Sequence, residues 1–455
     1  MHNHSGKTLG PARLTALGFL LLILTGTALL MLPFSAAASQ PTPFLPALFT
    51  ATSAVSLTGL IVQDTGTYWS PFGQAVIIAL IQVGGLGIMS LASLSGMLLT
   101  GRISLKARRT TAAESRPVDG GIRRTLLLTF MVTMLCEATV AVVITLRLLG
   151  AYDLSVQRAL WEGVFHAISA FNNAGFSTYD DNLVSFVGDA WIVLPLAAAL
   201  ISGGLGYPVL AEIARRLRSR IARLRGGNPR IHHMSITARM TFAATGILLG
   251  GGMVFFLVSE WNGVLAGLSP GVKLFNGFFM SASPRTAGFN TIDYAEAHPI
   301  TLMVTDILMF IGGGSAGTAG GVKVTTACVL AAAMAAEFLG REDTSIGHRR
   351  LPRSVTRQAL ALTVAGMMVV ATSVGLLRVF DPQFTADQVT FEVISAFATV
   401  GLSTGITASL SAPSQVILCL VMYLGRVGPT TLIAALAARA VRLRFRYPEE
   451  RPFIG

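Results

Sequence analysis

Charged residues are scarce in this chain. Asp, Glu, Lys and Arg make up 12% of its 455 residues, whereas hydrophobic residues make up 52%. Soluble domains carry about twice that share of charge. The chain also holds apolar runs long enough to cross a bilayer, of which residues 14–34 are the first. This composition excludes a single soluble core and predicts a polytopic α-helical membrane protein.

The motifs of metal binding, disulfide formation and catalysis are also lacking. The three cysteines, Cys136, Cys328 and Cys419, lie far apart inside apolar segments, without metal-ligand spacing or an obvious disulfide partner. We interpret them as packing residues. The histidines at 166, 232, 233 and 298 form no ligand pattern with nearby acids, and neither a phosphate-binding loop nor a catalytic triad is present. We therefore predict that the protein is not an enzyme and carries no prosthetic group.

The net charge of +12 is distributed unevenly along the chain. Most of the 34 lysines and arginines fall in five segments: 1–13, 101–124, 212–239, 341–357 and 439–455. The alternating segments 34–70, 150–190, 259–300 and 379–413 hold only Arg158, Lys273 and Arg285, but more than half of the 22 acidic residues. This is the positive-inside bias of membrane proteins. It predicts cytoplasmic N- and C-termini and contact with anionic membrane lipid rather than with nucleic acid, and it leaves a cytoplasmic docking surface as the alternative.

A motif of eleven residues occurs four times. It reads "FTATSAVSLTG" at 49–59, "FHAISAFNNAG" at 165–175, "FFMSASPRTAG" at 278–288 and "FEVISAFATVG" at 391–401. Each copy begins with Phe and ends with Gly, and the end glycines lie at nearly equal intervals. Each is followed by a second Gly-rich point, such as "VGGLGIM" or "SGGLGYP". The chain is therefore an internal repeat, with proposed units 1–100, 101–219, 220–340 and 341–455.

Each unit is predicted to contain a long apolar helix, a short segment ending at the glycine, and a second long apolar helix. The short segment spans about 20 Å, which is too little to cross a hydrocarbon layer of about 30 Å, so it must enter and return. Two crossings return the chain to its starting side, so all four units share one orientation. The predicted fold is all-α, with four parallel helix–re-entrant loop–helix repeats around a central pore, comprising about eight transmembrane and four pore helices.

The four loops are expected to line that pore. Non-helical backbone at membrane depth is tolerated only where protein buries it or where it lines a watery cavity. Glycine permits backbone angles that align successive carbonyl oxygens, which can replace the hydration shell of a monovalent cation. The alternative is that the glycines only allow close helix packing. A carrier or an intramembrane enzyme would be built in that second way.

Two further features lie below the predicted loops. "GGGSAGTAGG" at 312–321 holds six glycines and is expected to break the inner helix of the third unit, leaving a mobile segment that acts as a gate; a simple kink is the alternative. Arg426 lies in an apolar stretch of the fourth unit, where an unpaired charge usually faces a cavity. It either faces the pore or pairs with a carboxylate. Lys323 follows the broken segment, and Glu137 and Asp306 are expected to be structurally paired.

These motifs resemble those of the Ktr/Trk/HKT potassium transporter superfamily, and most closely its KtrB-type membrane subunits. The motifs that carry the resemblance are "TGL" at 58–60, "FNNAGFST" at 171–178, "RTAGFNTID" at 285–293, "TVGLSTGIT" at 399–407, "GGGSAGTAGGVK" at 312–323 and "GRVGP" at 425–429. The resemblance implies potassium uptake through one pore per chain, a homodimer, and a cytoplasmic nucleotide-binding ring of the KtrA type. It implies a bacterial inner-membrane location, with potassium as the transported ion and sodium or mixed cation transport as the alternative.

The resemblance also implies roles for individual residues. The expected selectivity filter comprises Thr58, Gly59, Asn173, Ala174, Gly175, Thr286, Ala287, Gly288, Thr399, Val400 and Gly401. Potassium is expected at Thr58, Gly59, Asn173, Gly175, Thr286, Gly288, Thr399 and Gly401. The expected gate comprises Gly312, Gly313, Gly314, Ser315, Gly317, Thr318, Gly320, Gly321, Lys323 and Arg426. One departure stands out, because the third unit has Ala282 where the others have Ser53, Ser169 and Ser395.

Overall fold

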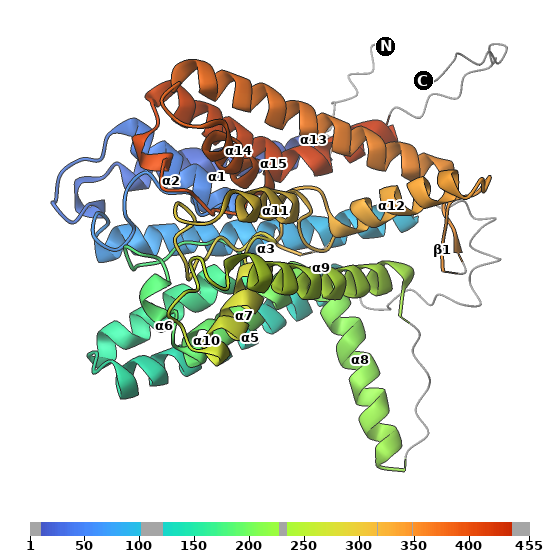
Figure 1. The fold of residues 1–455 in the computed structure, drawn as a ribbon, viewed down its shortest axis with the longest axis horizontal. Helices are drawn as coiled ribbons and strands as arrows, with labels where there is room; N and C mark the ends of the chain where they lie inside the picture. Colours follow the sequence, from blue (N-terminus) through green and yellow to red (C-terminus); the bar gives the residue numbers. More distant parts are fainter. Residues whose placement is uncertain (1–10, 102–121, 227–233, 316, 348, 439–455) are drawn as a thin grey trace, which may run out of the picture.

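The computed structural model describes residues 11–101, 122–226, 234–315, 317–347 and 349–438, and almost all of its regular structure is helical (Figure 1). The predicted inner segments at both chain ends and at 101–124 lie largely outside these residues, as do 227–233. In the described part, the regular strands are β1 (Ser345–Ile346) and β2 (Arg349–Arg350), which pair antiparallel as a small hairpin.

The elements follow the predicted repeat. The first unit contains α1 (Pro11–Leu30), the 3-10 turn η1 (Pro33–Ser35), α2 (Phe44–Ser56) and α3 (Pro71–Gly101). The second contains α5 (Ile122–Ala151), α6 (Val156–Phe171), η2 (Val184–Phe186), α7 (Ala190–Leu205) and α8 (Tyr207–Leu224). The third contains α9 (Ile236–Glu260), α10 (Pro270–Ala282), α11 (Pro299–Phe310) and α12 (Val324–Phe338). The fourth contains α13 (Arg353–Phe380), α14 (Ala386–Ala398), η3 (Thr407–Ser409) and α15 (Ala412–Ala438).

Local sequence signals fix where these helices begin. Ser155 and Ser235 cap α6 and α9 by accepting backbone N–H groups with their hydroxyls. Thr385 and Gln388 form a reciprocal capping box at the start of α14. Pro43 precedes the first residue of α2, where its missing N–H leaves no hydrogen bond unmade. The short helices α2, α6 and α14 therefore start at defined residues. Because their lengths are also defined, their carboxyl ends lie at fixed positions before the repeat glycines.

The units pack in a closed order. In Figure 1 the first unit, in blue, lies beside the fourth, in red, and α2 contacts α15. Contacts between α3 and α6, between α7 and α10, and between α11 and α14 join the remaining neighbours. Among the described residues, five buried hydrophobic clusters lie beneath these contacts and run between neighbouring units; one joins Phe171 of α6 to Phe279 of α10. Four units in cyclic contact enclose a common centre.

Three described helical stretches are long and apolar enough to cross a membrane: Leu127–Ala151, Ile236–Glu260 and Arg353–Phe380. The pair α7 and α8 would be a fourth only if the two helices formed one span, and they are bent by 106°. The predicted count of about eight crossings thus also depends on the shorter apolar helices of α1, α3, α15 and the interrupted pair α11 and α12. The break between α11 and α12 falls at the glycine-rich segment, as the sequence predicted.

Candidate functional site

Each short helix ends in a reversal of its backbone just before a repeat glycine. Leu57 lies at φ 58°, in the left-handed region, and Gly59 at φ 92°. The Thr58 N–H donates to the Ser53 carbonyl at 2.8 Å, and the Leu57 N–H to the Ala54 carbonyl at 3.2 Å. These are the two bonds of a Schellman cap, which closes the helix and turns the chain away from it.

The same pattern of positive φ occurs in all four units. The residues two positions before each glycine, Asn173, Thr286 and Thr399, have φ of 56°, 94° and 51°, like Leu57. The glycines Gly175, Gly288 and Gly401 have φ of 71°, 73° and 96°. Glycine adopts this conformation at no steric cost, whereas other residues pay for it. The sequence motif is therefore also a motif of backbone geometry.

The four glycines form a closed ring. A β-carbon built on each would meet the carbonyl oxygen that precedes the next glycine: Gly59 meets Ala174 at 2.4 Å, Gly175 meets Ala287 at 2.8 Å, Gly288 meets Val400 at 2.1 Å, and Gly401 meets Thr58 at 2.1 Å. The last contact returns to the first unit. Four loops far apart in sequence therefore meet around one axis, and none of these glycines has room for a side chain.

A buried serine hydroxyl holds each loop. In the first and fourth units, Ser53 and Ser395 accept the N–H groups of Gly59 and Gly401, each at 3.0 Å. In the second unit, Ser169 donates instead to the carbonyl of Phe176, directly after the glycine, at 2.8 Å. All three serines are fully buried. Each hydroxyl therefore fixes a peptide group on one side of the glycine or the other.

The third unit replaces its missing serine with the next residue. Ala282 cannot bond, but the Ser283 hydroxyl donates to the carbonyl of Phe289, the counterpart of Phe176. The helix α10 ends earlier relative to its glycine than the other three short helices do, and the Ala287 N–H donates to Ser283, four positions back, rather than five. The absence of a serine at position 282 is thus compensated by Ser283, one residue later, which bonds the loop carbonyl instead.

The outer segments that follow the glycines are anchored in two ways. In the second unit, His166 bonds the hydroxyl of Ser177 at 3.0 Å. In the fourth, Glu392 occupies the equivalent position of α14 and accepts the Ser403 hydroxyl and the Thr404 N–H, the latter at 3.1 Å. The equivalent residues of the first and third units are Thr50 and Phe279. Polar anchors therefore occur in units that alternate around the ring.

The glycine-rich segment forms a packed loop under the ring. Gly312 donates to Val322 at 2.9 Å, and Val324 donates to Gly313 at 3.0 Å, so the two ends of the loop lie together. Farther along, the N–H groups of Gly314 and Thr318 donate to Gly204 and Gly203, at the carboxyl end of α7, at 2.9 and 3.3 Å. The loop that was predicted to be mobile is closed and hydrogen-bonded to the second unit.

This loop contacts the base of the ring in three units. The Asn173 amide lies 2.9 Å from the Thr318 hydroxyl in either orientation of that amide. A β-carbon on Gly320 would lie 2.0 Å from the Thr399 hydroxyl oxygen, and one on Gly312 would lie 3.4 Å from the Thr286 methyl group. The loop therefore lies directly against Asn173, Thr286 and Thr399, the residues two positions before three of the four ring glycines.

Arg426 of α15 reaches this loop. Its side chain is 6% exposed, and its Nη1 donates to the Thr318 carbonyl. The Nε and Nη2 atoms have no partner, and no carboxylate lies within ion-pair distance among the described residues. The alternative expectation, pairing with a carboxylate, is therefore not met among the described residues, and a position facing the pore stays a prediction. Lys323 bonds the Ala319 carbonyl within the loop itself.

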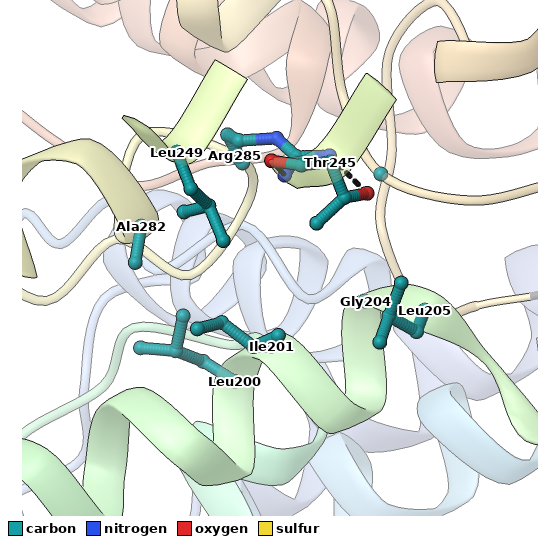
Figure 2. Close-up of a pocket in the computed structure, with 9 residues that line it drawn as sticks. Leu200, Ile201, Gly204, Leu205, Thr245, Leu249, Ala282 and Arg285 are labelled. Carbon is teal, nitrogen blue, oxygen red and sulfur yellow. Dashed lines mark hydrogen bonds between the residues drawn. The ribbon is translucent and has the colours of Figure 1, made fainter. Parts of the chain in front are cut away.

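Arg285 is a second buried arginine, which the sequence reading assigned to an outer segment. Its side chain is 8% exposed and directly precedes Thr286. Figure 2 shows its guanidinium against Thr245 of α9, across a small pocket from Leu200, Ile201 and Gly204 of α7. Nη2 donates to the Thr245 hydroxyl at 3.1 Å, and Nη1 lies 3.4 Å from its carbonyl oxygen. The sequence signal that could have indicated a role for Arg285 at the ring is its position directly before "TAG" at 286–288.

The two buried acids left unassigned by the sequence have different surroundings. Glu137 of α5 accepts amide hydrogens from Asn172 at 2.9 Å and Gln82 at 3.3 Å, which ties α3 and α5 to the base of the second loop. Structural pairing was the expectation and is what the structure shows for Glu137. Asp306 of α11 instead has a buried carboxylate oxygen without a hydrogen-bond partner.

Known proteins share this fold and match nearly the whole length of this chain. The cation transport protein family TrkH matches residues 15–441. The Ktr system potassium uptake protein B of Bacillus subtilis is 37% identical over 98% of this chain and 97% of its own length. The potassium/sodium uptake protein NtpJ of Enterococcus hirae is 34% identical over 99% and 98%. The crystal structure of the potassium transporter TrkH from Vibrio parahaemolyticus has a TM-score of 0.73 at 19% identity, covering 96% of this chain and 86% of that one.

The helical fold and these matches define a membrane cation transporter. The chain belongs to the TrkH family of cation transport proteins. The resemblance to the Ktr/Trk/HKT superfamily and the all-α polytopic fold are thereby confirmed.

Proposed function

We propose that this protein carries potassium into the cell through a pore at the centre of the four glycine loops. The observation that supports this most strongly is the closed ring, in which each glycine lies against the carbonyl that precedes the next. Carbonyl oxygens in such a ring can replace the water shell of a monovalent cation. Relatives named as potassium uptake proteins over nearly the full chain length agree with this substrate.

The filter comprises the residues expected from the sequence, from Thr58 and Gly59 in the first unit to Thr399, Val400 and Gly401 in the fourth. In each unit, the repeat glycine and the residue two positions before it both have positive φ. The carbonyl of the residue between them is therefore oriented differently from those of its neighbours. The four short helices direct their carboxyl ends toward the ring, and the partial negative charge there favours a cation. The serine hydroxyls hold the peptides so that the oxygens need not reorganise when the ion arrives.

The loop 311–323 is the proposed gate, and Arg426 and Lys323 control it. The loop lies against three of the four loop bases and bonds to α7 and α15, so its position is set by several neighbours at once. A partner that moves any of these neighbours changes the balance between blocking and open arrangements. A fixed positive charge on Arg426 also raises the local barrier to a cation, because the surrounding dielectric is low.

Sodium or mixed cation transport is the second candidate. It is favoured by the relative NtpJ, which is named a potassium/sodium uptake protein. Against it stands the presence of glycine at all four ring positions. A residue with a side chain at any of these positions would displace a carbonyl and give the smaller ion an advantage.

The proposed assembly follows the superfamily. Two such chains form a homodimer in the bacterial inner membrane, with both termini in the cytoplasm, and a nucleotide-binding ring of the KtrA type binds the cytoplasmic face. Relatives named as components of a Ktr system are consistent with a partner. The distribution of Lys and Arg along the chain supports the orientation.

Ion competition tests the proposed function. The full chain is expressed with its regulator in a bacterium that lacks its own potassium uptake systems, and uptake of labelled rubidium is measured against excess potassium or sodium. We expect potassium to compete strongly and sodium weakly. Equal competition by both ions would support the second candidate, and no uptake by a well-expressed, membrane-inserted protein would contradict ion conduction.

A further inference from the structure

Helix α8 leaves the bundle. It follows α7 after a single residue, Gly206, whose φ of 82° permits the sharp turn, and the two helices differ in direction by 106°. Figure 1 shows α8 extending to the side, away from the roughly parallel long helices. The long helices include stretches that are long and apolar enough to cross a membrane, so a helix that extends sideways from them would run close to the plane of the bilayer.

One face of α8 is an apolar stripe. Leu210, Ile213, Leu217, Ile221 and Leu224 follow one another at intervals of three or four residues, which is the spacing of one helix face. Near the bundle, Leu210 and Ile213 pack against Leu205 and Ala238. Beyond that point the stripe loses its cover, because Leu217, Ile221 and Leu224 are 56%, 41% and 88% exposed.

The same part of the helix is strongly basic. Six arginines lie between 215 and 225, and all of them are exposed: Arg215, Arg216, Arg218, Arg220, Arg223 and Arg225. In the described part of the chain none of them forms an ion pair. The only acid in α8 is Glu212, and its carboxylate accepts the N–H of Ser235 at 2.9 Å. No acidic side chain of the described residues therefore balances the charge of this segment.

We propose that residues 214–225 bind the anionic lipid surface of the cytoplasmic leaflet. Leu217, Ile221 and Leu224 enter the boundary between headgroups and acyl chains, and the arginines on both flanks of the stripe extend to lipid phosphates. An amphipathic helix with a basic polar face that lies parallel to the bilayer has the geometry and charge of an interfacial helix. Arginine side chains are long enough to bury their stems while keeping the guanidinium at the headgroups.

Lipid accounts for more of these observations than a soluble protein does. A docked protein would cover only one face of the helix. Here arginines flank the apolar stripe on both sides, as in a helix whose apolar face is inserted between anionic headgroups. The helix also emerges sideways from a membrane-embedded helix, where lipid is the immediate neighbour. The contact is independent of which ion the pore carries, so its failure and that of the proposed function are distinguishable.

Hydrogen exchange measured by mass spectrometry tests the proposal. The full chain is reconstituted in vesicles of phosphatidylcholine alone and in vesicles that also contain phosphatidylglycerol, without any regulator. We expect exchange in 207–224 to be slower with the anionic lipid, and the protection to fall as salt is raised. Each arginine near an anionic surface strengthens binding about fivefold. Replacing Arg216, Arg220 and Arg223 with Gln should therefore remove most of the protection.

Two matched variants make the test specific. Replacing Leu217, Ile221 and Leu224 with Ser keeps every charge and should also abolish protection, because the apolar insertion is lost. Replacing Arg341, Arg349 and Arg357 with Gln removes the same charge from other exposed positions and should leave exchange in α8 unchanged. Equal exchange of α8 in the two vesicle types would overturn the proposal, and so would protection that appears only when the cytoplasmic regulator is added.

Discussion

The glycine ring and the loop beneath it are both rich in glycine, but they are built on opposite principles. The ring repeats one geometry four times, with the same pair of left-handed residues and the same approach of glycine to a neighbouring carbonyl in each unit. The loop 311–323 occurs once, and its partners differ on every side: α7, Asn173, Thr399 and Arg426.

This difference matches what the two regions are proposed to do. An ion at the axis needs oxygens arranged evenly around it, and a repeated loop supplies them with little variation. A gate needs two arrangements of similar free energy, and a single loop held by several weak contacts can be biased by any of them. Ring variants should therefore alter which ion passes, whereas loop variants should alter how much passes.

The largest expected effect is on selectivity, from Gly59→Ser. The left-handed φ costs a residue with a side chain about 1–2 kcal/mol, and the new β-carbon would lie 2.4 Å from the Ala174 oxygen, so that oxygen must move. We expect the preference for potassium over sodium to fall by about tenfold or more, since tenfold corresponds to about 1.4 kcal/mol. Competition uptake measures it.

Gly405 provides the matched control. It also has a positive φ, of 86°, but a β-carbon there would meet nothing within 4 Å. Gly405→Ser therefore carries the backbone strain without the collision and should leave the preference unchanged. If both variants lose selectivity equally, or neither does, the carbonyl contact around the ring is not what selects the ion.

The next effect concerns the amount of flux. Deleting residues 313–320 removes the part of the loop that contacts Asn173 and Thr399, while Gly312 and Val322, which are already hydrogen-bonded, keep the ends together. We expect flux to rise about tenfold, corresponding to about 1.4 kcal/mol of closing free energy, and to lose its dependence on the regulator. Selectivity should be retained. A shortened protein that stays closed until the regulator is added would mean that the gate lies elsewhere.

Sequence reasoning located the ring because repetition is visible in one chain. Four copies of a Phe-to-Gly motif specify four equivalent short helices, and equivalent helices around an axis place their ends together. The loop could be located but not described, since six glycines predict a break and not its partners. Its packing depends on Gly203 and Gly204 of another unit, and no feature of the sequence links those positions to 314 and 318. The burial of Arg285 was not predicted for a similar reason, because it depends on Thr245, forty residues away.

A smaller rise in flux is expected from Arg426→Gln. The charge and its contact with the Thr318 carbonyl are lost, but the rest of the loop keeps its bonds to α7. One such hydrogen bond contributes about 1 kcal/mol, which predicts a rise of about fivefold per folded molecule. Arg426→Lys, which keeps the charge, should show a smaller rise. A fall in the yield of assembled protein without a rise in flux per molecule would indicate that Arg426 serves folding alone.

Arg285→Gln should affect the ring but not the loop 311–323, the opposite of what is expected for Arg426→Gln. Arg285 holds the residue before Thr286 to α9 but makes no hydrogen bond to the loop 311–323 among the described residues. Its loss should lower the preference for potassium by about threefold, with flux nearly unchanged, because about one hydrogen bond to Thr245 is lost. Thr245→Val removes the hydroxyl acceptor and should reproduce part of the effect. A change in flux without a change in selectivity would place Arg285 with the gate instead.

The smallest expected effect tests the shifted serine of the third unit. Ser283→Ala removes the hydroxyl that donates to the Phe289 carbonyl, and a single neutral hydrogen bond is worth about 0.5–1.5 kcal/mol. We expect the preference for potassium to fall about two- to threefold, as it should for Ser169→Ala, whose hydroxyl holds the equivalent carbonyl. Moving the serine back to the position it occupies in the other units, with Ala282→Ser added to Ser283→Ala, should not restore the preference. The reason is that α10 ends early, at Ala282, and in this unit the residue that bonds the Phe289 carbonyl is the next one, Ser283. Restoration by the double variant would show that the loop of the third unit can adopt the register of the other three, and that its shift is a consequence of sequence rather than a requirement of the ring.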